Sequence, residues 1–247
     1  MSNYRPIFIV AEIGINHGGD LSKAKELIEK AKASGAEAAK FQLYDPRQRP
    51  DIEEHPFKEV LLKSKLTKRM LYELKEMCDR NYIEFMCSVF DVERVGWLEE
   101  IRVERYKIAS KCVYDKELIG EILLTGKDII VSSGYLDAEI GWPDNLLEAW
   151  VKQRVSYLYC VSKYPATLKD LDLRNTVFSP AQYVGYSDHT IGITACLLAM
   201  CRGARIIEKH LTLDKMADGP DHILSALPDE LELLCKFRDE IERILYL

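Results

Sequence analysis

The chain has 247 residues, 47% of them hydrophobic and 30% charged, and its formal net charge at pH 7 is −6. This apolar content supplies a sizeable core and excludes a disordered chain, while the acidic balance argues against a nucleic-acid partner, which needs a basic face to neutralise phosphates. No apolar run approaches the roughly 20 residues that cross a bilayer, so we expect no membrane partner either.

Short apolar runs alternate with helical patterns along the whole chain. Going along the sequence, the expected elements are a strand at Ile7–Ile13, a helix at Asp20–Ser34, a strand at Ala38–Leu43, a helix at Thr67–Arg80, a strand at Ile83–Val89, a helix at Asp91–Glu100, a strand at Tyr106–Ser110, a helix at Asp115–Leu124, a strand at Asp128–Ser133, a helix near Pro143–Gln153, a strand at Ser156–Ser162, an irregular crossover with a short helix, a strand at Tyr183–Ser187, a helix at Thr190–Arg202, a strand at Arg205–Leu211 and a helix at Pro228–Tyr246.

This strict alternation predicts parallel strands, because each helix returns the chain to the same edge of the sheet. Eight strand–helix units of roughly 30 residues each predict an α/β protein of the (β/α)8 TIM-barrel class, formed as one domain over residues 1–247. A doubly wound open sheet is the alternative, weakened because no G-x-G-x-x-G follows the first strand. The proline-rich stretch Asp45–Lys65 is too long for an ordinary connection and indicates a functional loop or lid.

The seven cysteines give an odd count and include no C-x-x-C pair. Several of them lie inside apolar runs, so they are expected to be reduced and buried. Such thiols are typical of a cytoplasmic protein.

The predicted strands end in chemically reactive residues. In a barrel of this class the active site lies at the carboxyl ends of the strands. Those ends carry Glu12, Lys40, Gln42, Ser88, Lys107, Ser110, Ser132, Ser187, His189, Glu208 and His210. Lysines supply charge and hydroxyls supply donors for phosphate oxygens, so the set indicates a phosphorylated anion beside a divalent metal. Glu12 and Lys40 could equally form a simple ion pair between neighbouring strands.

Alternation along a strand sharpens this expectation. Lys40 and Gln42 share a face, as do Glu208 and His210, and such groups are costly to bury beneath a helix layer. We therefore expect these side chains to point into the barrel mouth. His189 and His210 end neighbouring strands, and two imidazoles with open positions suit Mn, Fe, Co or Zn.

Taken in order, these segments resemble the sialic acid (N-acetylneuraminate) synthase family and its pseudaminic and legionaminic acid relatives. The matching segments are Ala11–His17, Lys40–Gln42, Tyr106–Ser110, Ser132–Gly134, Tyr164–Pro165, Gly185–Thr190, Glu208–His210 and Gly219–Asp221. They span nearly the whole chain, and the first and sixth are specific.

The resemblance implies a barrel that condenses phosphoenolpyruvate with an N-acetylated amino sugar, using a divalent metal that would be Mn first, with Mg or Co as alternatives. It implies that phosphoenolpyruvate is held by Lys40, Ser88, Lys107, Ser110, Ser132 and Ser187, that the metal is held by His189 and His210, that Glu12 transfers protons, and that the sugar faces Gln42, Tyr164 and Asp221. Glu12, Lys40 and Lys107 would be the catalytic residues.

Two departures from the family concern the sugar. The family's C-terminal antifreeze-like domain has no counterpart after the last predicted helix, so we expect either that a homodimer or a separate partner domain supplies that side or that the sugar site is different. The family's acidic residue after the Lys107 strand is Cys112 here, and its asparagine before the Tyr-Pro pair is Ser162. We therefore expect a different or smaller acceptor, or weak activity on N-acetylmannosamine.

Two other functions remain open. A Schiff-base aldolase could use Lys163 or Lys107 to form an imine. A barrel that binds a phosphorylated ligand without turning it over is the other alternative.

Overall fold

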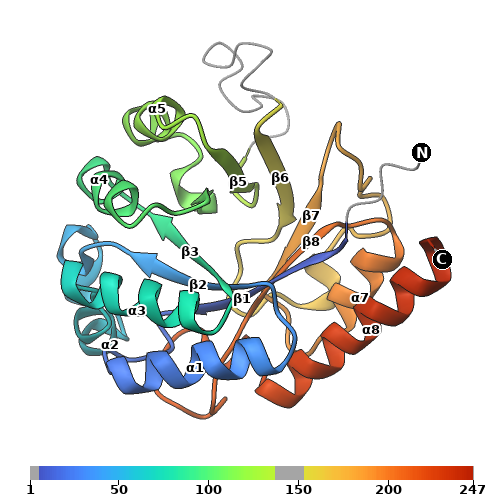
Figure 1. Cartoon of the computed structure of the whole chain (residues 1–247), viewed down its shortest axis with the longest axis horizontal. Helices are drawn as coiled ribbons and strands as arrows, with labels where there is room; N and C mark the ends of the chain where they lie inside the picture. Colours follow the sequence, from blue (N-terminus) through green and yellow to red (C-terminus); the bar gives the residue numbers. More distant parts are fainter. Residues whose placement is uncertain (1–5, 137–152, 247) are drawn as a thin grey trace.

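The computed structural model describes residues 6–136 and 153–246, and their strands form a closed barrel (Figure 1). All eight strands are parallel and follow one another in sequence order, with the last paired to the first. They are β1 (Phe8–Gly14), β2 (Ala38–Leu43), β3 (Glu84–Val89), β4 (Arg105–Ile108), β5 (Asp128–Ser132), β6 (Val155–Cys160), β7 (Gly185–Asp188) and β8 (Ile206–His210). The predicted (β/α)8 barrel is confirmed.

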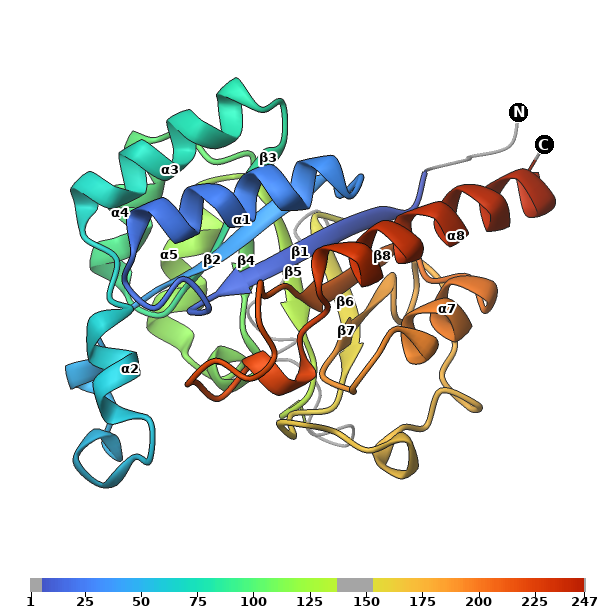
Figure 2. The same cartoon turned by 90° about the horizontal axis from the view of Figure 1, so that it is seen from below.

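The helices lie outside the ring of strands (Figures 1 and 2). They are α1 (Leu21–Ala33), α2 (Lys58–Lys63), α3 (Lys68–Arg80), α4 (Val92–Glu100), α5 (Lys116–Leu124), α7 (Thr194–Cys201) and α8 (Pro228–Tyr246), with 3-10 turns at Pro46–Gln48, Ile52–Glu54, Ser110–Cys112, Leu168–Asp170 and His222–Leu224. The helix predicted near Pro143–Gln153 falls outside the described residues. Over residues 6–136 and 153–246, no helix combines the length and apolar character that a membrane crossing requires.

Side-chain caps explain where the helices begin. Asp20, Thr67, Asp91 and Asp115 each accept a hydrogen bond from a backbone N–H of the turn that follows. The exception is α7, which begins at Thr194 instead of the predicted Thr190. The backbone N–H and the hydroxyl of Thr190 donate to the Asp188 carboxylate, which holds this residue in the loop.

The barrel interior has an apolar layer directly beneath a polar one. The apolar layer consists of Val10, Ala38, Met86, Ile130 and Leu158, with Phe8 and Ile206 against it. Two residues further along their strands come Glu12, Lys40, Ser88, Ser132 and Glu208, which therefore point into the same interior. The apolar layer closes the floor, and the polar layer faces the mouth.

The segment between β2 and α3 projects beyond the barrel and carries α2 (Figure 2). Its Ile52 and Leu61 pack with Ile15 and Tyr44 in a small cluster apart from the main core. Lys65 and Asp45 close its base with an ion pair of 2.6 Å. The segment is thus a folded appendage, and its predicted role as a lid stays a prediction.

Candidate active site

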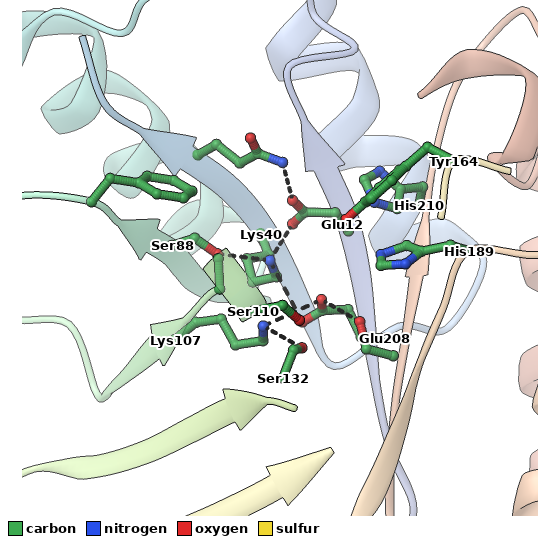
Figure 3. Close-up of a pocket in the computed structure, with 14 residues that line it drawn as sticks. Glu12, Lys40, Ser88, Lys107, Ser110, Ser132, Tyr164, His189, Glu208 and His210 are labelled. Atoms are coloured by element: carbon green, nitrogen blue, oxygen red, sulfur yellow. Dashed lines mark hydrogen bonds and ion pairs between the residues drawn. The ribbon is translucent and has the colours of Figure 1, made fainter. Parts of the chain in front are cut away.

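A small polar cavity opens at the carboxyl ends of the strands (Figure 3). It is lined by Glu12, Lys40, Gln42, Ser88, Phe90, Lys107, Ala109, Ser110, Ser132, Tyr164, Ser187, His189, Glu208 and His210. Every site residue expected from the sequence is in this lining except Asp221. The structure therefore brings residues from all eight strands, or from the loops that follow them, to one place.

Two buried lysines and two buried carboxylates form the centre of the cavity (Figure 3). Lys40 Nζ lies 2.7 Å from Glu12 Oε2 and 3.5 Å from Glu208 Oε2. Lys107 Nζ lies 3.6 Å from Glu208 Oε1. The simple Glu12–Lys40 pair is therefore present, within a larger network in which Glu208 stands between both lysines.

Serine hydroxyls extend this network. Lys40 Nζ donates to Ser88 Oγ at 3.0 Å, and Lys107 Nζ donates to Ser132 Oγ at 2.7 Å. Ser187 Oγ donates to Glu208 Oε1 at 3.0 Å. Each lysine is thus presented together with a hydroxyl, a combination that suits phosphate and carboxylate oxygens.

Burial shifts the protonation of these groups. It raises the pKa of Glu12, and the charge of Lys40 offsets this only in part. Burial lowers the pKa of Lys107 against the opposing charge of Glu208. A buried carboxyl group with a raised pKa beside a cation is suited to proton transfer.

Ser110 is hydrogen-bonded by Gly134, where a larger residue would be crowded. The backbone N–H of Gly134 donates to Ser110 Oγ at 3.1 Å. A Cβ at Gly134 would overlap the hydroxyl of Ser162 and come within 3.0 Å of Ser110 Oγ. The glycine after β5 thus allows the two loops to meet at the cavity wall.

The two histidines are arranged so that they could hold one metal ion. His189 Nδ1 lies 2.8 Å from the carbonyl oxygen of Val161, which only accepts, so Nδ1 carries a proton and Nε2 is the nitrogen that would bind a metal. Against the effect of burial, the neighbouring Cys160 raises the pKa of His189 to about 9, so a metal would displace a proton from Nε2. Burial and the neighbouring positive groups lower the pKa of His210, which keeps its imidazole neutral. The ring centroids are 5.6 Å apart. Two imidazoles that bind one metal at about 2.1 Å place their centroids roughly 5 to 6 Å apart, so the pair fits.

No group of three or more His, Cys, Asp or Glu side chains within residues 6–136 and 153–246 is arranged to hold an ion by itself. The histidine pair is therefore an open site. Water or substrate would have to fill the remaining positions.

Two of the residues expected to face a sugar, Tyr164 and Asp221, lie beside the histidines, and Gln42 lies beside Glu12. Gln42 Nε2 donates to Glu12 Oε1 at 3.0 Å. The ring of Tyr164, which is 51% exposed, stands 4.2 Å from the His189 ring. Asp221 is behind the lining, with Oδ2 at 3.8 Å from His210 Nδ1, and burial raises its pKa to about 6.

One candidate from the sequence lies elsewhere. Lys163 points to the surface and pairs with Asp170, so the expectation that it could form an imine in the active site is wrong. Cys112, which stands where the family has an acidic residue, is buried, and burial raises the pKa of its thiol to about 11.

The structure also shows roles that the sequence did not reveal. Glu208 was recognisable as an inward carboxylate, but its place between two lysines depends on three strands. Phe90 and Ala109 line the cavity without any polar signal in the sequence.

The chain is similar over most of its length to a known family and to several known proteins. The model of the NeuB family matches residues 27–246. An uncharacterised protein of Methanocaldococcus jannaschii is 37% identical over 246 residues, covering 97% of this chain and 72% of its own length. N,N'-diacetyllegionaminic acid synthase of Legionella pneumophila is 34% identical over 259 residues, covering 96% of this chain and 73% of its own.

Among solved structures, N-acetylneuraminic acid (sialic acid) synthetase of Leptospira borgpetersenii, in complex with citrate, superimposes with a TM-score of 0.88 at 34% identity. The match covers 100% of this chain and 89% of that one. Fold, length of match and identity agree, and the chain belongs to the NeuB family.

Proposed function

We propose that this protein condenses phosphoenolpyruvate with the open-chain aldehyde of an N-acetylated amino sugar or a related aldehyde, giving a nonulosonic acid and inorganic phosphate. The observation that carries this proposal is the placing of two lysine–serine pairs directly beside two imidazoles in one cavity. Relatives named as legionaminic and sialic acid synthases support it.

Phosphoenolpyruvate would occupy the lysine side of the cavity. Lys40 and Lys107 would neutralise its phosphate and carboxylate, and Ser88, Ser110, Ser132 and Ser187 would donate hydrogen bonds to the oxygens. Glu208 would stay close to the reacting carbons, because it is held between both lysines. Much of the catalysis would then come from positioning and from fixed charges.

The reaction forms one carbon–carbon bond and breaks one carbon–oxygen bond. C3 of phosphoenolpyruvate attacks the aldehyde carbon, and the aldehyde oxygen takes up a proton. Glu208 stabilises the positive charge that develops at C2. Water then adds to C2 and loses one proton, which balances the proton taken up by the aldehyde oxygen, where Glu12 exchanges protons. The new C2 hydroxyl gives its proton to the phosphate as the phosphate leaves with the C2–O electron pair, and C2 becomes a ketone.

His189 and His210 would hold a divalent metal, for which Mn is our first choice and Mg or Co are alternatives. When bound, the metal supplies Lewis-acid polarisation of the aldehyde carbonyl. The protein's own part is to orient the His189 ring through the Val161 carbonyl and to keep the His210 imidazole neutral.

The acceptor would contact Gln42, Tyr164 and Asp221. Cys112 and Ser162 replace an acidic residue and an asparagine of the family, so we expect an acceptor other than N-acetylmannosamine, or weak activity with it. A cytoplasmic location suits the free cysteines.

The test is phosphate release from phosphoenolpyruvate with a panel of amino sugars, with and without Mn and with EDTA. We expect release that requires a sugar, stops with EDTA and falls at least 100-fold in His210→Ala. The matched control is His55→Ala, which removes a histidine outside the cavity lining and should leave the rate unchanged. Absence of release with every sugar, while phosphoenolpyruvate still binds by calorimetry, would favour the binding barrel.

A Schiff-base aldolase using Lys107 is the second candidate, because burial lowers the pKa of this lysine as imine chemistry requires. Borohydride reduction in the presence of pyruvate tests it. A mass increase on Lys107 would support the aldolase. Unmodified protein would exclude the aldolase and leave the synthase as the remaining enzyme function.

A further inference from the structure

A second ion pair lies directly behind the two histidines, on the outer side of the barrel. Asp188 and Lys209 face each other across β7 and β8, and each precedes one of the histidines in the chain. Lys209 Nζ lies 2.8 Å from Asp188 Oδ2, and both side chains are completely buried. Because side chains alternate along a strand, this pair and the histidines point in opposite directions from the same backbone.

Both oxygens of the Asp188 carboxylate accept hydrogen bonds. Oδ1 accepts from the Tyr186 hydroxyl at 2.8 Å and from the N–H and hydroxyl of Thr190 at 2.9 and 2.8 Å. Oδ2 accepts from Lys209 and from the Cys196 thiol. The residues on both sides of His189 are thus fixed through one carboxylate.

Lys209 joins this arrangement to β8. Its ammonium also donates to the backbone carbonyl of Thr190, so it contacts the chain on both sides of His189 while its own backbone leads into His210. His210 Nδ1 is buried and has no hydrogen-bond partner among the described residues. The orientation of the His210 ring therefore depends on the backbone that Lys209 anchors.

A buried ion pair of this kind stabilises a protein core poorly. Burying two charges costs desolvation energy that apolar side chains of similar size avoid, so stability alone does not account for it. Lys209 contacts the last residue of β7 and the loop that follows it, which an apolar side chain could not do, and so fixes the distance between the ends of β7 and β8.

We propose that Asp188 and Lys209 are positioning residues that set the separation of the His189 and His210 imidazoles and hence the affinity of the site for a divalent metal. The statement about metal affinity rests on the proposed function. The statement about ring separation is independent of it.

The experiment compares wild type with Lys209→Met and with Asp188→Asn/Lys209→Met, which removes both charges so that neither is left buried alone. Binding of Mn²⁺ is measured by electron paramagnetic resonance well below each melting temperature. We expect both variants to bind Mn²⁺ about 10- to 100-fold more weakly, the usual effect of losing an outer partner of a metal ligand. Crystal structures without metal should show the ring centroids displaced from 5.6 Å.

The matched control is Arg238→Met, which breaks a half-buried ion pair with Glu37 near the start of β2, away from the histidines. It should lower the melting temperature yet leave Mn²⁺ affinity within about twofold. Lys209 variants that bind Mn²⁺ like this control, with unmoved rings, would overturn the proposal. If wild type itself binds no Mn²⁺, Mg²⁺ or Co²⁺, the metal part of the proposed function fails, and the ring separation alone decides the positioning role.

Discussion

Glu208 is the residue on which the charge balance of the cavity depends. It is the one carboxylate within ion-pair distance of Lys107 in the part of the chain that the structure describes, whereas Lys40 also has Glu12. We expect the substitution Glu208→Gln to lower the free energy of unfolding by about 3–5 kcal/mol, because it leaves Lys107 as an uncompensated buried charge. For a protein of this size that lowers the melting temperature by on the order of 10 °C. Added phosphoenolpyruvate should raise the melting temperature more than it does in wild type, since the ligand supplies the missing negative charge.

The deficit of Glu208→Gln should also depend on pH. Burial lowers the pKa of Lys107, and losing Glu208 lowers it further. Between this pKa and the ordinary value, the unfolded chain binds more protons than the folded one, so the stability of the variant rises with pH. We expect the difference from wild type to be smaller at pH 9 than at pH 7. Glu230→Gln breaks a partly exposed pair with Lys215 and should cost no more than about 1 kcal/mol at either pH. A pH-independent deficit in Glu208→Gln would contradict the argument.

For such residues, the sequence predicts which face of a strand they occupy better than it predicts which side chains they pair with. Strand alternation was enough to place Lys40, Gln42, Glu208 and His210 on the inner face, and the structure puts all four in the cavity lining. Which carboxylate meets which lysine depends on the stagger between strands, which no single segment encodes. Lys163 shows the converse: it follows β6 by three residues, yet its loop turns it outward to Asp170.

At the scale of elements, strands such as β1 and β5 were predictable because they are buried on both faces and contain continuous apolar runs. The predicted Ile7–Ile13 and the observed β1 differ by one residue at each end. Short elements in the β2–α3 segment escaped prediction. The helix α2 has six residues, of which only Leu61 is fully buried, so it has no helical stripe long enough to recognise.

The β2–α3 segment should unfold separately from the barrel. Leu61 is 3% exposed and packs in the small cluster with Ile15, Tyr44 and Ile52. Leu61→Ala should cost roughly 2–4 kcal/mol locally. Hydrogen exchange read by mass spectrometry should show lost protection over residues 46–63, while β1 and β3 exchange as before. Lys63→Ala on the exposed side of α2 should change nothing, and loss of protection throughout the barrel would show that the segment belongs to the main folding unit.

At the scale of the whole molecule, the two ends of the chain close the barrel together. β1 pairs with β8 from Phe8–Ile206 to Glu12–His210, so the first and last strands share one seam. Helix α8 covers the same region of the barrel and packs against α1 and α7 (Figure 2). The active site therefore depends on residues near the end of the sequence, since two proposed ligands and Glu208 lie beyond residue 187.

Removing α8 should consequently unfold the molecule, whereas trimming its last turn should not. Truncation after Leu227 removes Leu231 and Leu234, both fully buried, at about 1.5–3 kcal/mol each, and exposes the apolar faces they covered. It also removes Arg238, which pairs with Glu37, and Glu242, whose carboxylate accepts from the Ile7 N–H. These losses approach the whole stability of about 5–15 kcal/mol, so we expect no cooperative thermal transition by circular dichroism. Truncation after Arg243 removes the exposed Ile244 and Leu245 and retains every one of those contacts, so its melting temperature should stay within a few degrees of the full chain. A folded protein without α8 would mean that the seam between β1 and β8 is stable by strand pairing alone.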